Sequence, residues 1–383
     1  MTQYIFFITE ILLALYCLLI FVYAYWFWRL RMKTFSGVEK TPQTKFSIVI
    51  PARNEEANIA PCLLSILDNN YPKNLFEIMV VDDESKDRTA AIVRQLSEKY
   101  PLLKLLNIND WTGGQPFNSH KKKAIEFAVS RAANDWMITT DADCIVPKNW
   151  LASFDKYIRQ TQKRFIAAPV AFTDNHSFLG RFQCLDFLSL QGITIASVSA
   201  GMHNMCNGAN LCYEKQLFLD VRGFAGIDQW ASGDDMLLMD KVQRQFPDAV
   251  GYLYSQSAIV FTAPMPTWKA FIHQRIRWAS KNAHYRDVRI TAVLCGVYLT
   301  NLFLLISLVY ALFQPFYLLY WFGLVIVKTL AELLLMQPTA AFFKQKKLLK
   351  WFPLMQPLHI FYIVAAGFLG MFGKYQWKER MVK

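Results

Sequence analysis

Apolar residues gather at the two ends of the chain, whereas the middle alternates short apolar runs with amphipathic segments. Near the N-terminus, residues 4–28 are apolar apart from Glu10, and this length suits a helix that crosses a bilayer. Three further apolar stretches close the chain, at residues 290–313, 316–336 and 354–372. We therefore predict one N-terminal and about three C-terminal membrane helices, with Gln314 and Pro315 turning the chain between the first two of the C-terminal set.

The middle of the chain carries four short apolar runs that predict strands, at residues 46–50, 76–81, 103–108 and 136–140. Between them, residues 57–67, 88–100 and 121–133 repeat apolar positions at the helical period. Alternating strands and helices predict an α/β fold with a mostly parallel, Rossmann-like sheet. Ligands bind such sheets at the carboxyl ends of the strands, so the polar residues that follow each strand should converge on one crevice.

Two further segments, residues 178–199 and 267–284, mix apolar and polar positions. A helix of this kind lies on a membrane surface when its apolar face meets lipid. A helix that faces an ordinary protein core has the same pattern, so the sequence leaves both interpretations open.

The charge distribution supports the membrane assignment. The 383 residues include 41 Lys and Arg against 29 Asp and Glu, for a net charge of +12. The basic residues cluster beside the apolar stretches, at Arg29, Arg31 and Lys33 and again at Lys344, Lys346, Lys347 and Lys350. This placement fits lipid headgroups and the positive-inside rule better than a nucleic-acid groove, so we expect membrane lipids and no nucleic acid as partners. The chain then enters the cytosol at Arg29. With four spans, the basic tail at residues 374–383 would lie outside the cell, which the positive-inside rule disfavours. The alternative is that one of the four segments lies in the membrane interface and does not span it.

Paired carboxylates follow the fourth predicted strand and recur before a later helix. Asp141 and Asp143 alternate directly after the strand, and oxygen ligands in that position suit a hard cation, Mg²⁺ or Mn²⁺. In the second pair, Asp234 and Asp235, one carboxylate can stay ionised and act as a general base on an acceptor hydroxyl, a role that we assign to Asp235. The alternatives are a solvated turn for the first pair and a helix N-cap for the second.

The loops after the first two predicted strands carry further candidate ligand contacts. These residues are Pro51, Arg53 and Glu55 in the first loop and Asp82 and Asp83 in the second. Arg53 suits a phosphate, and Asp82 suits the edge of a base or a ribose. Helix capping by Asn54 or Ser85 is the structural alternative, and it is compatible with binding.

Two basic segments complete the set of candidates. Lys121 opens the third predicted helix and can meet a phosphate, although residues 120–123 are also typical of a solvated charge run. The segment QRIRW contributes Gln274, Arg275, Arg277 and Trp278. On a helix, Gln274 and Arg277 share a face, where an indole can hold a sugar and Arg can meet phosphate. The alternative is a basic amphipathic surface helix without a ligand.

Taken in chain order, these segments resemble glycosyltransferase family 2, whose catalytic domains have the GT-A fold. The order is PARNEE, VDDESKD, a Lys-led helix, DAD, GAN at residues 208–210, RGF at residues 222–224, GDD and QRIRW. The resemblance runs from about Phe46 to Trp278. The QxxRW pattern marks the membrane-bound branch that is similar to cellulose, chitin, hyaluronan and poly-N-acetylglucosamine synthases and to ceramide glucosyltransferases.

The resemblance implies a role for each motif. Asp82 or Asp83 would contact the nucleotide base, Asp141 the diphosphate and Asp143 the metal. Asp235 matches the family's catalytic base. The helix that meets acceptor and diphosphate is matched by Gln274, Arg277 and Trp278. Two departures fall in the donor pocket, because His120 stands where the family often has Gly and Glu126 where it often has Asn.

We therefore expect an inverting, metal-dependent hexosyltransferase that moves a sugar from a nucleotide diphosphate sugar, usually a UDP-sugar in this family, to a growing glycan or a lipid. Residues 1–33 would be an anchor, 45–265 a cytosolic catalytic domain, 266–288 an interface helix and 289–383 membrane helices. Such a chain would be a multi-pass protein of a bacterial inner or plasma membrane. The alternatives are a polyprenyl-phosphate sugar synthase and a non-catalytic membrane scaffold that retains the fold.

Overall fold

The computed structural model describes residues 2–32, 41–113, 118–230, 232–280, 287–372, 375–377 and 380–382. The chain divides into two compact units. The helical unit comprises Met1–Thr34, Thr173–His203 and Pro264–Gly373, and the α/β unit comprises Phe35–Phe172, Asn204–Ala263 and Lys374–Lys383. The segment Thr173–His203, which we expected within the 45–265 domain, thus belongs to the unit that carries the long apolar helices.

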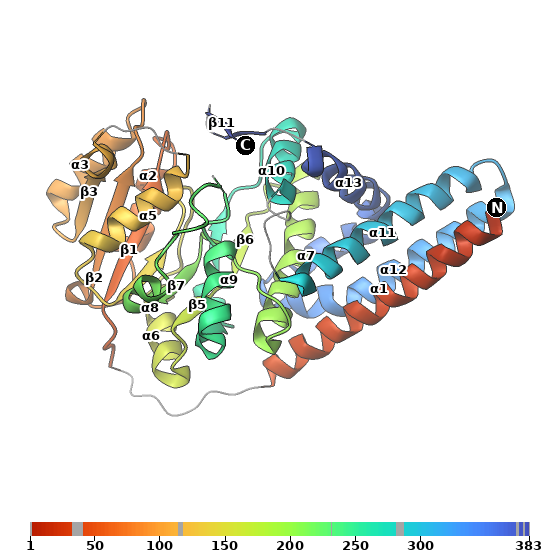
Figure 1. Cartoon of the computed structure of the whole chain (residues 1–383), viewed down its shortest axis with the longest axis horizontal. Helices are drawn as coiled ribbons and strands as arrows, with labels where there is room; N and C mark the ends of the chain where they lie inside the picture. The colour runs from red at the N-terminus through yellow and green to blue at the C-terminus, as the bar shows by residue number, and fades with distance from the viewer. Residues whose placement is uncertain are drawn as a thin grey trace. The chain divides into compact units, whose positions relative to one another are not determined.

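The α/β unit alternates strands and helices along its first half, as the sequence predicted (Figure 1). Its first elements are β1 (Phe46–Ala52), α2 (Ile59–Leu67), β2 (Phe76–Asp82), α3 (Thr89–Lys99), β3 (Leu103–Asn107), α4 (Asn109–Thr112), α5 (His120–Arg131) and β4 (Trp136–Thr139). The later ones are α6 (Trp150–Thr161), β5 (Phe165–Ala167), β6 (Val170–Phe172), β7 (Leu211–Glu214), α8 (Lys215–Asp220), α9 (Met236–Gln245), β8 (Val250–Tyr252) and β9 (Val260–Thr262). A short antiparallel pair, β10 (Tyr375–Trp377) and β11 (Arg380–Val382), ends the chain.

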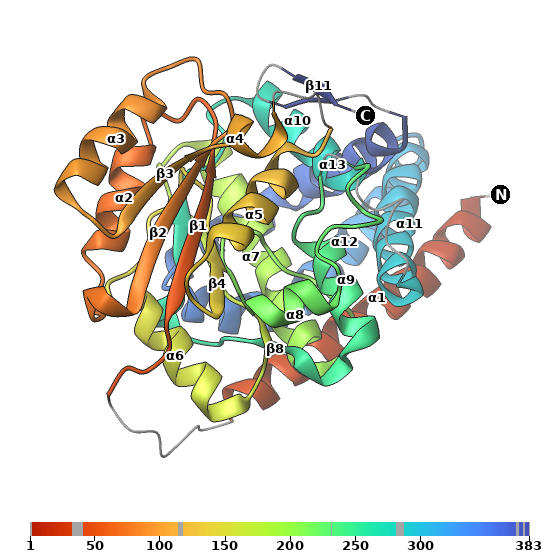
Figure 2. The same cartoon turned by 60° about the vertical axis from the view of Figure 1, so that its left-hand side comes forward.

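The central sheet has the strand order β3-β2-β1-β4-β7-β5-β8 (Figure 2). The strands β3, β2, β1 and β4 are parallel, whereas β7 runs antiparallel to both β4 and β5. The strands β1 and β2 are almost fully buried and mostly apolar, because helices cover both faces of a parallel sheet. The predicted mostly parallel α/β sheet is confirmed, and its four parallel strands end at one common edge.

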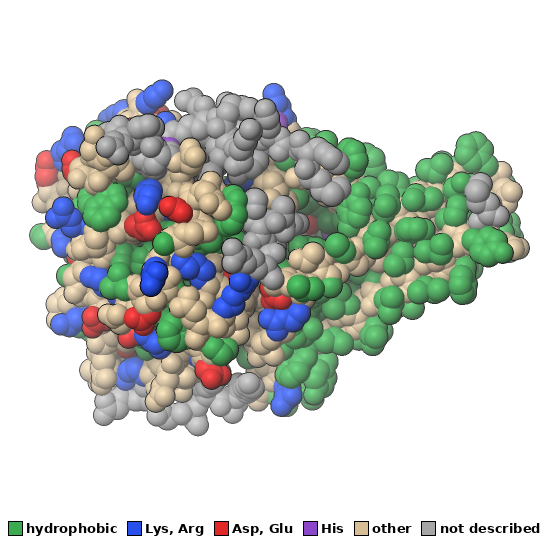
Figure 3. All heavy atoms as spheres, viewed as in Figure 1, with side chains coloured by type: hydrophobic (Ala, Val, Ile, Leu, Met, Phe, Trp, Pro, Cys, Tyr) green, Lys and Arg blue, Asp and Glu red, His purple; other side chains and the backbone are tan. Residues whose placement is uncertain are grey.

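Four helices of the helical unit are long and apolar enough to cross a membrane, as predicted. They are α1 (Thr2–Arg31), α11 (Val288–Ala311), α12 (Pro315–Phe342) and α13 (Phe352–Phe372), the last extended at its start by the turn Lys346–Trp351. The break at Pro315 falls where the sequence placed it, since proline suits the first turn of a helix. Hydrophobic side chains cover the outward face of α1 and α11 (Figure 3), as lipid-facing helices require.

The helix α7 (Phe178–Ala200) is a core helix of this unit. It contacts both α1 and α12, and most of its side chains are buried. Its approach to α12 is close at Gly192, where an added Cβ would lie 2.6 Å from Thr339 Oγ1. Of the two interpretations that the sequence left open for residues 178–199, the core-facing helix is correct. The second ambiguous segment forms α10 (Trp268–Ser280), which contacts α13.

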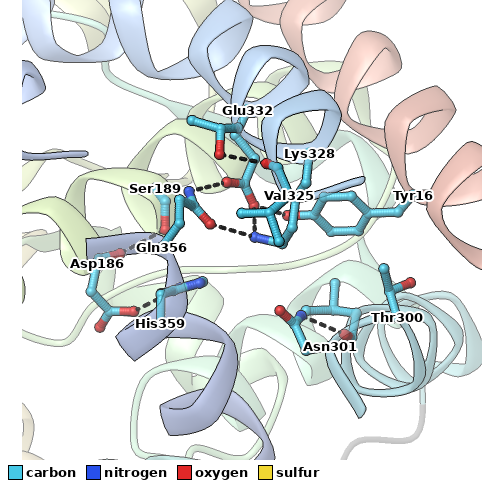
Figure 4. A network of polar contacts seen from close by, with 12 residues as sticks. Tyr16, Asp186, Ser189, Thr300, Asn301, Val325, Lys328, Glu332, Gln356 and His359 are labelled. Atoms are coloured by element: carbon cyan, nitrogen blue, oxygen red, sulfur yellow. Dashed lines mark hydrogen bonds and ion pairs between the residues drawn. The ribbon is translucent and has the colours of Figure 1, made fainter. Parts of the chain in front are cut away.

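Polar side chains join three of the long helices through one buried network (Figure 4). The ammonium of Lys328 on α12 donates to Glu332 Oε1 at 2.6 Å and to Gln356 Oε1 of α13 at 2.9 Å. Glu332 also accepts hydrogen bonds from Gln356 and from the hydroxyl of Tyr16 on α1. Lys328 is completely buried, and these mutual contacts are what allow charged groups to sit among apolar helices.

Candidate active site

The loops that leave β1 and β2 begin side by side. Ala52 and Asp82 are partners in the parallel register, and the Asp83 amide donates to the Ala52 carbonyl at 2.9 Å. Immediately afterwards, Asn54 and Glu84 both adopt the left-handed backbone, with φ of 52° and 55°. Non-glycine residues in this region mark strained turns that the surrounding structure must hold in place.

Side chains from each loop hold the other. Arg53 is buried, and its Nη1 donates to the carbonyl oxygens of Asp83 (2.5 Å) and Glu84 (3.3 Å). The Asn54 amide donates to Ser85 Oγ at 3.1 Å. Asn54 Oδ1 in turn accepts from the backbone amide that follows Ser85. Asn54 and Ser85 therefore tie the two loops together. The alternative that they cap α2 and α3 is wrong, because the N-cap positions of these helices are Asn58 and Arg88.

The remaining predicted residues of the first loop lie close to these contacts. Pro51 occupies the penultimate position of β1 and is partly exposed. The Glu55 amide donates to Thr89 Oγ1 at 2.7 Å, and its carboxylate accepts from the side chain of Asn58. Both residues therefore lie at the sheet edge where ligands bind in this class of fold.

The adjacent carboxylates Asp82 and Asp83 have different surroundings. Asp83 Oδ1 lies 2.7 Å from Nδ1 of His120. His120, which stands where the family often has Gly, thus contacts Asp83. Asp82 is buried, and its Oδ1 has no hydrogen-bond partner among the described residues. Burial raises the pKa of the Asp82 carboxyl, which hydrogen bonds from Ser85 only partly oppose. Asp82 also lines a cavity of about 550 Å³ shared with Arg94. Asp82 Oδ1 can therefore accept a hydrogen bond from a ligand.

Lys121 links the two acidic motifs. Its Nζ lies 2.7 Å from Asp141 Oδ1 of the DAD motif and 3.1 Å from Asp234 Oδ2 of the GDD motif. Burial lowers the pKa of the Lys121 ammonium, but the two carboxylates outweigh this effect and raise that pKa well above its usual range. The lysine is therefore a permanent cation between carboxylates from distant parts of the sequence.

Asp235 and Gly208 meet directly beside this ion-pair cluster. The Gly208 amide donates to Asp235 Oδ2 at 3.2 Å, and the Met236 amide donates to Asp235 Oδ1 at 2.7 Å, which caps α9. Thr139, the last residue of β4, donates from its hydroxyl to the Gly208 carbonyl at 3.0 Å. The N-cap alternative for Asp235 is thus correct as a structural role. The two amides hold the Asp235 carboxylate in a fixed orientation beside Gly208.

The basic run at residues 120–123 is not a solvated surface. Lys122 is completely buried and donates to the carbonyl oxygens of Ile227 and Trp230, in the segment before GDD. Lys121 is only 20% exposed. The solvated interpretation of this run is therefore wrong, because these ammonium groups satisfy buried oxygen atoms.

The acidic residues after β4 offer a limited set of metal ligands. Among the residues that the structure describes, no three His, Cys, Asp or Glu side chains form a group able to hold a metal by themselves. Asp143 is partly exposed, and Asp141 gives one oxygen to Lys121. A cation such as Mg²⁺ binds one or two carboxylates together with waters and substrate phosphates. These residues therefore fit a cation that is shared with a diphosphate.

The QRIRW motif lies on α10, in the helical unit. Gln274, Arg277 and Trp278 are partly exposed, whereas Arg275 is buried with its Nη2 at 2.8 Å from Asp186 Oδ2 of α7. The sequence grouped Arg275 with the acceptor and diphosphate contacts. Within this unit it instead forms an internal ion pair, because a buried guanidinium requires an anionic partner.

Sequence reasoning missed Asp186 and the structural role of Lys122. The available signal for Asp186 was a single acidic residue within the otherwise apolar and neutral part of α7. A lone charge in such a helix indicates a buried partner, but its identity is not readable from local sequence.

Comparisons with known proteins identify the family of the chain. The model of glycosyl transferase family 2 matches residues 47–185, and that of glycosyl transferase family group 2 matches residues 136–336. The chain is 26% identical over 256 residues to the probable glycosyltransferase YdaM of Bacillus subtilis, covering 63% of this chain and 56% of the relative. It is 33% identical over 110 residues to the beta-monoglucosyldiacylglycerol synthase of Synechocystis, covering 29% and 22%. The chain thus spans about half the length, or less, of these curated relatives.

The fold has a solved counterpart. The mannosyltransferase PcManGT from Pyrobaculum calidifontis superposes with a TM-score of 0.61 at 18% identity, covering 97% of this chain and 99% of that one. At this identity the likeness concerns the fold. Because one family model spans more than half of the chain, this chain is a member of glycosyltransferase family 2 with a GT-A fold.

Proposed function

We propose that the protein is a membrane-bound, inverting glycosyltransferase that moves a hexose from a nucleoside diphosphate sugar to a lipid or glycan acceptor. The observation that carries this proposal is the cluster around Lys121, which brings the DAD and GDD motifs to one edge of the sheet. A sugar donor with a diphosphate needs cationic and anionic groups in one place, to hold the leaving group and to activate the acceptor.

Asp235 is the proposed general base. It accepts the proton of the acceptor hydroxyl, whose oxygen forms a bond to the anomeric carbon while the bond to the diphosphate oxygen breaks. Attack from the side opposite the leaving group inverts the anomeric configuration. The amides of Gly208 and Met236 hold the carboxylate in a fixed orientation, which supports the assignment because a positioned base is the effective one.

Asp82 is the proposed contact to the nucleotide base, supported by its unsatisfied oxygen and the adjoining cavity. Lys121 and Arg53 are proposed to face the diphosphate, with Pro51 and Glu55 lining the donor side. Asp143, with Asp141, would hold a divalent cation, Mg²⁺ or Mn²⁺, whose chemistry is to neutralise the charge of the departing diphosphate. In keeping with this, the Pyrobaculum mannosyltransferase was solved with GDP-mannose and Mn²⁺.

The acceptor side is proposed to use Gln274, Arg277 and Trp278 on α10, in the unit that carries the four candidate spans. A lipid acceptor is supported by the Synechocystis relative, whose name describes a glucosyldiacylglycerol synthase. Within residues 45–265, the part that belongs to the α/β unit is the proposed cytosolic catalytic domain of a protein of a bacterial inner or plasma membrane, and Thr173–His203 belongs to the helical unit.

Transfer by the purified full-length chain tests the proposal. The protein in nanodiscs is incubated with membrane lipids, Mn²⁺ or Mg²⁺ and a panel of UDP- and GDP-sugars, and products are identified by mass spectrometry. We expect one glycosylated product class, its loss on adding EDTA, and inverted anomeric configuration. A single lipid-linked sugar identifies a lipid acceptor, and a ladder of masses identifies a polymer.

The variant Asp235→Asn tests the base. It should lower turnover by about 10²–10⁴-fold, the usual contribution of general-base catalysis, while donor binding is retained. The exposed Asp248 of the same unit provides the control Asp248→Asn, which should keep wild-type turnover. Near wild-type turnover in Asp235→Asn refutes the base assignment. No transfer or donor hydrolysis under any condition favours the scaffold alternative.

A further inference from the structure

Arg275 occupies the centre of a buried cluster in the helical unit. Only 2% of the residue is exposed, and its Nη2 lies 2.8 Å from Asp186 Oδ2 on α7. The guanidinium carbon lies 4.1 Å from the ring centroid of Trp278 and 4.9 Å from that of Phe271, both on the same helix. The indole of Trp278 also contacts the ring of Phe187 on α7, at 5.9 Å between centroids.

Asp186 connects this cluster to a third helix. Its Oδ1 lies 3.6 Å from Nε2 of His359 on α13, and the two side chains face each other in Figure 4. Burial raises the pKa of the Asp186 carboxyl, but Arg275 and His359 outweigh this and leave that pKa below its usual range. Asp186 is therefore held as an anion between α10 and α13.

The buried guanidinium depends on few partners. Its Nε and Nη1 have no hydrogen bond among the described residues, and the contacts of the guanidinium are the Asp186 carboxylate and the rings of Phe271 and Trp278. Removing one member of such a pair leaves an uncompensated charge in the interior. The ion pair of Arg275 with Asp186 and the ring contact of Trp278 with Phe187 therefore link α10 to α7.

Helical geometry relates this anchor to the rest of the motif. Successive residues turn by about 100°, so Arg277 points about 160° away from Arg275 around the helix axis. Gln274 projects between Arg277 and Trp278, and these three side chains share one face. Trp278 lies between that face and the Arg275–Phe271 side, and it touches the anchor through its indole.

We propose that Arg275 is a positioning residue, which together with Asp186 sets the rotation of α10 so that Gln274, Arg277 and Trp278 face the acceptor. Arg275 itself touches neither substrate. The inference rests on the proposed function, and it assigns the residue between Gln274 and Arg277 a role distinct from theirs.

Steady-state kinetics of the full-length protein in nanodiscs test the inference. Arg275→Met and Asp186→Asn should each lower kcat by about tenfold or more, since small misplacements of positioning groups have effects of this size. The donor KM should change less than about threefold, because the proposed donor contacts are in the α/β unit. Lys269→Met replaces an exposed cation of the same helix and should match the wild type.

Two comparisons separate positioning from a general loss of structure. The double variant Arg275→Met with Asp186→Asn should lose no more activity than either single variant, because the two residues act as one unit. Arg275→Lys keeps the charge without the planar fork and should recover part of kcat. It also carries the test if Arg275→Met fails to fold.

Two results overturn the inference. Wild-type kcat in the Arg275 and Asp186 variants, with loss of transfer in Arg277→Ala, refutes the positioning role and leaves the proposed function standing. Multiplicative losses in the double variant refute the joint action of the pair. Full activity in Arg277→Ala removes the substrate-facing role of α10 and refutes the inference together with that part of the proposed function.

Discussion

Replacing Gly208 with alanine perturbs the candidate active site with little effect on the fold. An added Cβ would lie 2.9 Å from Asp234 Oδ2, 3.1 Å from Lys121 Nζ and 3.6 Å from the Cβ of Asp235. Ordinary contacts begin near 3.4 Å, so the Asp234 oxygen must retreat by about 0.5 Å and the ammonium by about 0.3 Å. Gly208 does not use the left-handed backbone, and both displaced atoms are side-chain ends. We therefore expect unchanged folding and a distorted site.

A displacement of this size should lower transfer by about 10–100-fold, or about 1.4–2.8 kcal/mol of transition-state stabilisation. The assay measures kcat by product formation and thermal unfolding by fluorescence, on the same nanodisc samples. Gly296→Ala is the matched control, because an added Cβ there meets no atom within 4 Å. Transfer within twofold of wild type in Gly208→Ala refutes the idea that close approach at this glycine shapes the active site.

Three further variants probe other contacts. Lys121→Met should weaken binding of a nucleoside diphosphate by about 10–150-fold, measured by calorimetry, since a charge-assisted hydrogen bond contributes about 1.5–3 kcal/mol. The control Lys148→Met removes the lysine of an exposed ion pair with Asp68 and should leave binding unchanged. Burial raises the pKa of Glu77, but hydrogen bonds from Lys104, Ser47 and Ala133 outweigh burial and leave that pKa lowered. The ionised Glu77 therefore stabilises the fold above the unfolded pKa near 4.5, and this contribution is lost as pH falls through the lower folded pKa. Glu77→Gln should therefore unfold at a lower temperature at pH 7 and lose less stability than wild type on acidification; an unchanged acid dependence contradicts this. Lys328→Met should destabilise the helical unit by about 3–5 kcal/mol, because it removes the cation that offsets the buried Glu332 charge. Lys328→Met with Glu332→Leu should recover most of this loss, and a double variant less stable than the single one refutes the pairing.

The elements of the α/β unit followed closely from the sequence. The observed β1, β2, β3 and β4 lie within two residues of the predicted runs, because a buried parallel strand is written as a short continuous apolar segment. Two of the motif positions at the strand ends were also predictable, since Asp82 ends β2 and Asp141 and Asp143 come soon after β4 in the sequence. What each carboxylate contacts was not predictable in the same way: Asp83 meets His120, and Asp235 both caps a helix and accepts from Gly208.

The contacts of charged residues are what the local sequence predicted least well. Lys122 belongs to a run that is typical of solvent-exposed helices, yet it is buried against carbonyl oxygens of a later segment. Arg275 lies within a motif associated with substrates, yet it pairs with Asp186, which is far from it in the chain. A charge in sequence carries no mark of its distant partner, and the partner decides whether burial is tolerable.

The sequence by itself determined the apolar segments long enough to span a membrane, the order of strands and helices, and the family, because each of these is written in residues close together along the chain. Only the tertiary structure decided which polar groups meet across the chain: Lys121 with Asp141 and Asp234, Arg275 with Asp186, and Lys328 of α12 with Gln356 of α13. The physical reason is that hydrophobic periodicity is a local property, whereas the cost of burying a charge is offset only by the groups that folding brings to it.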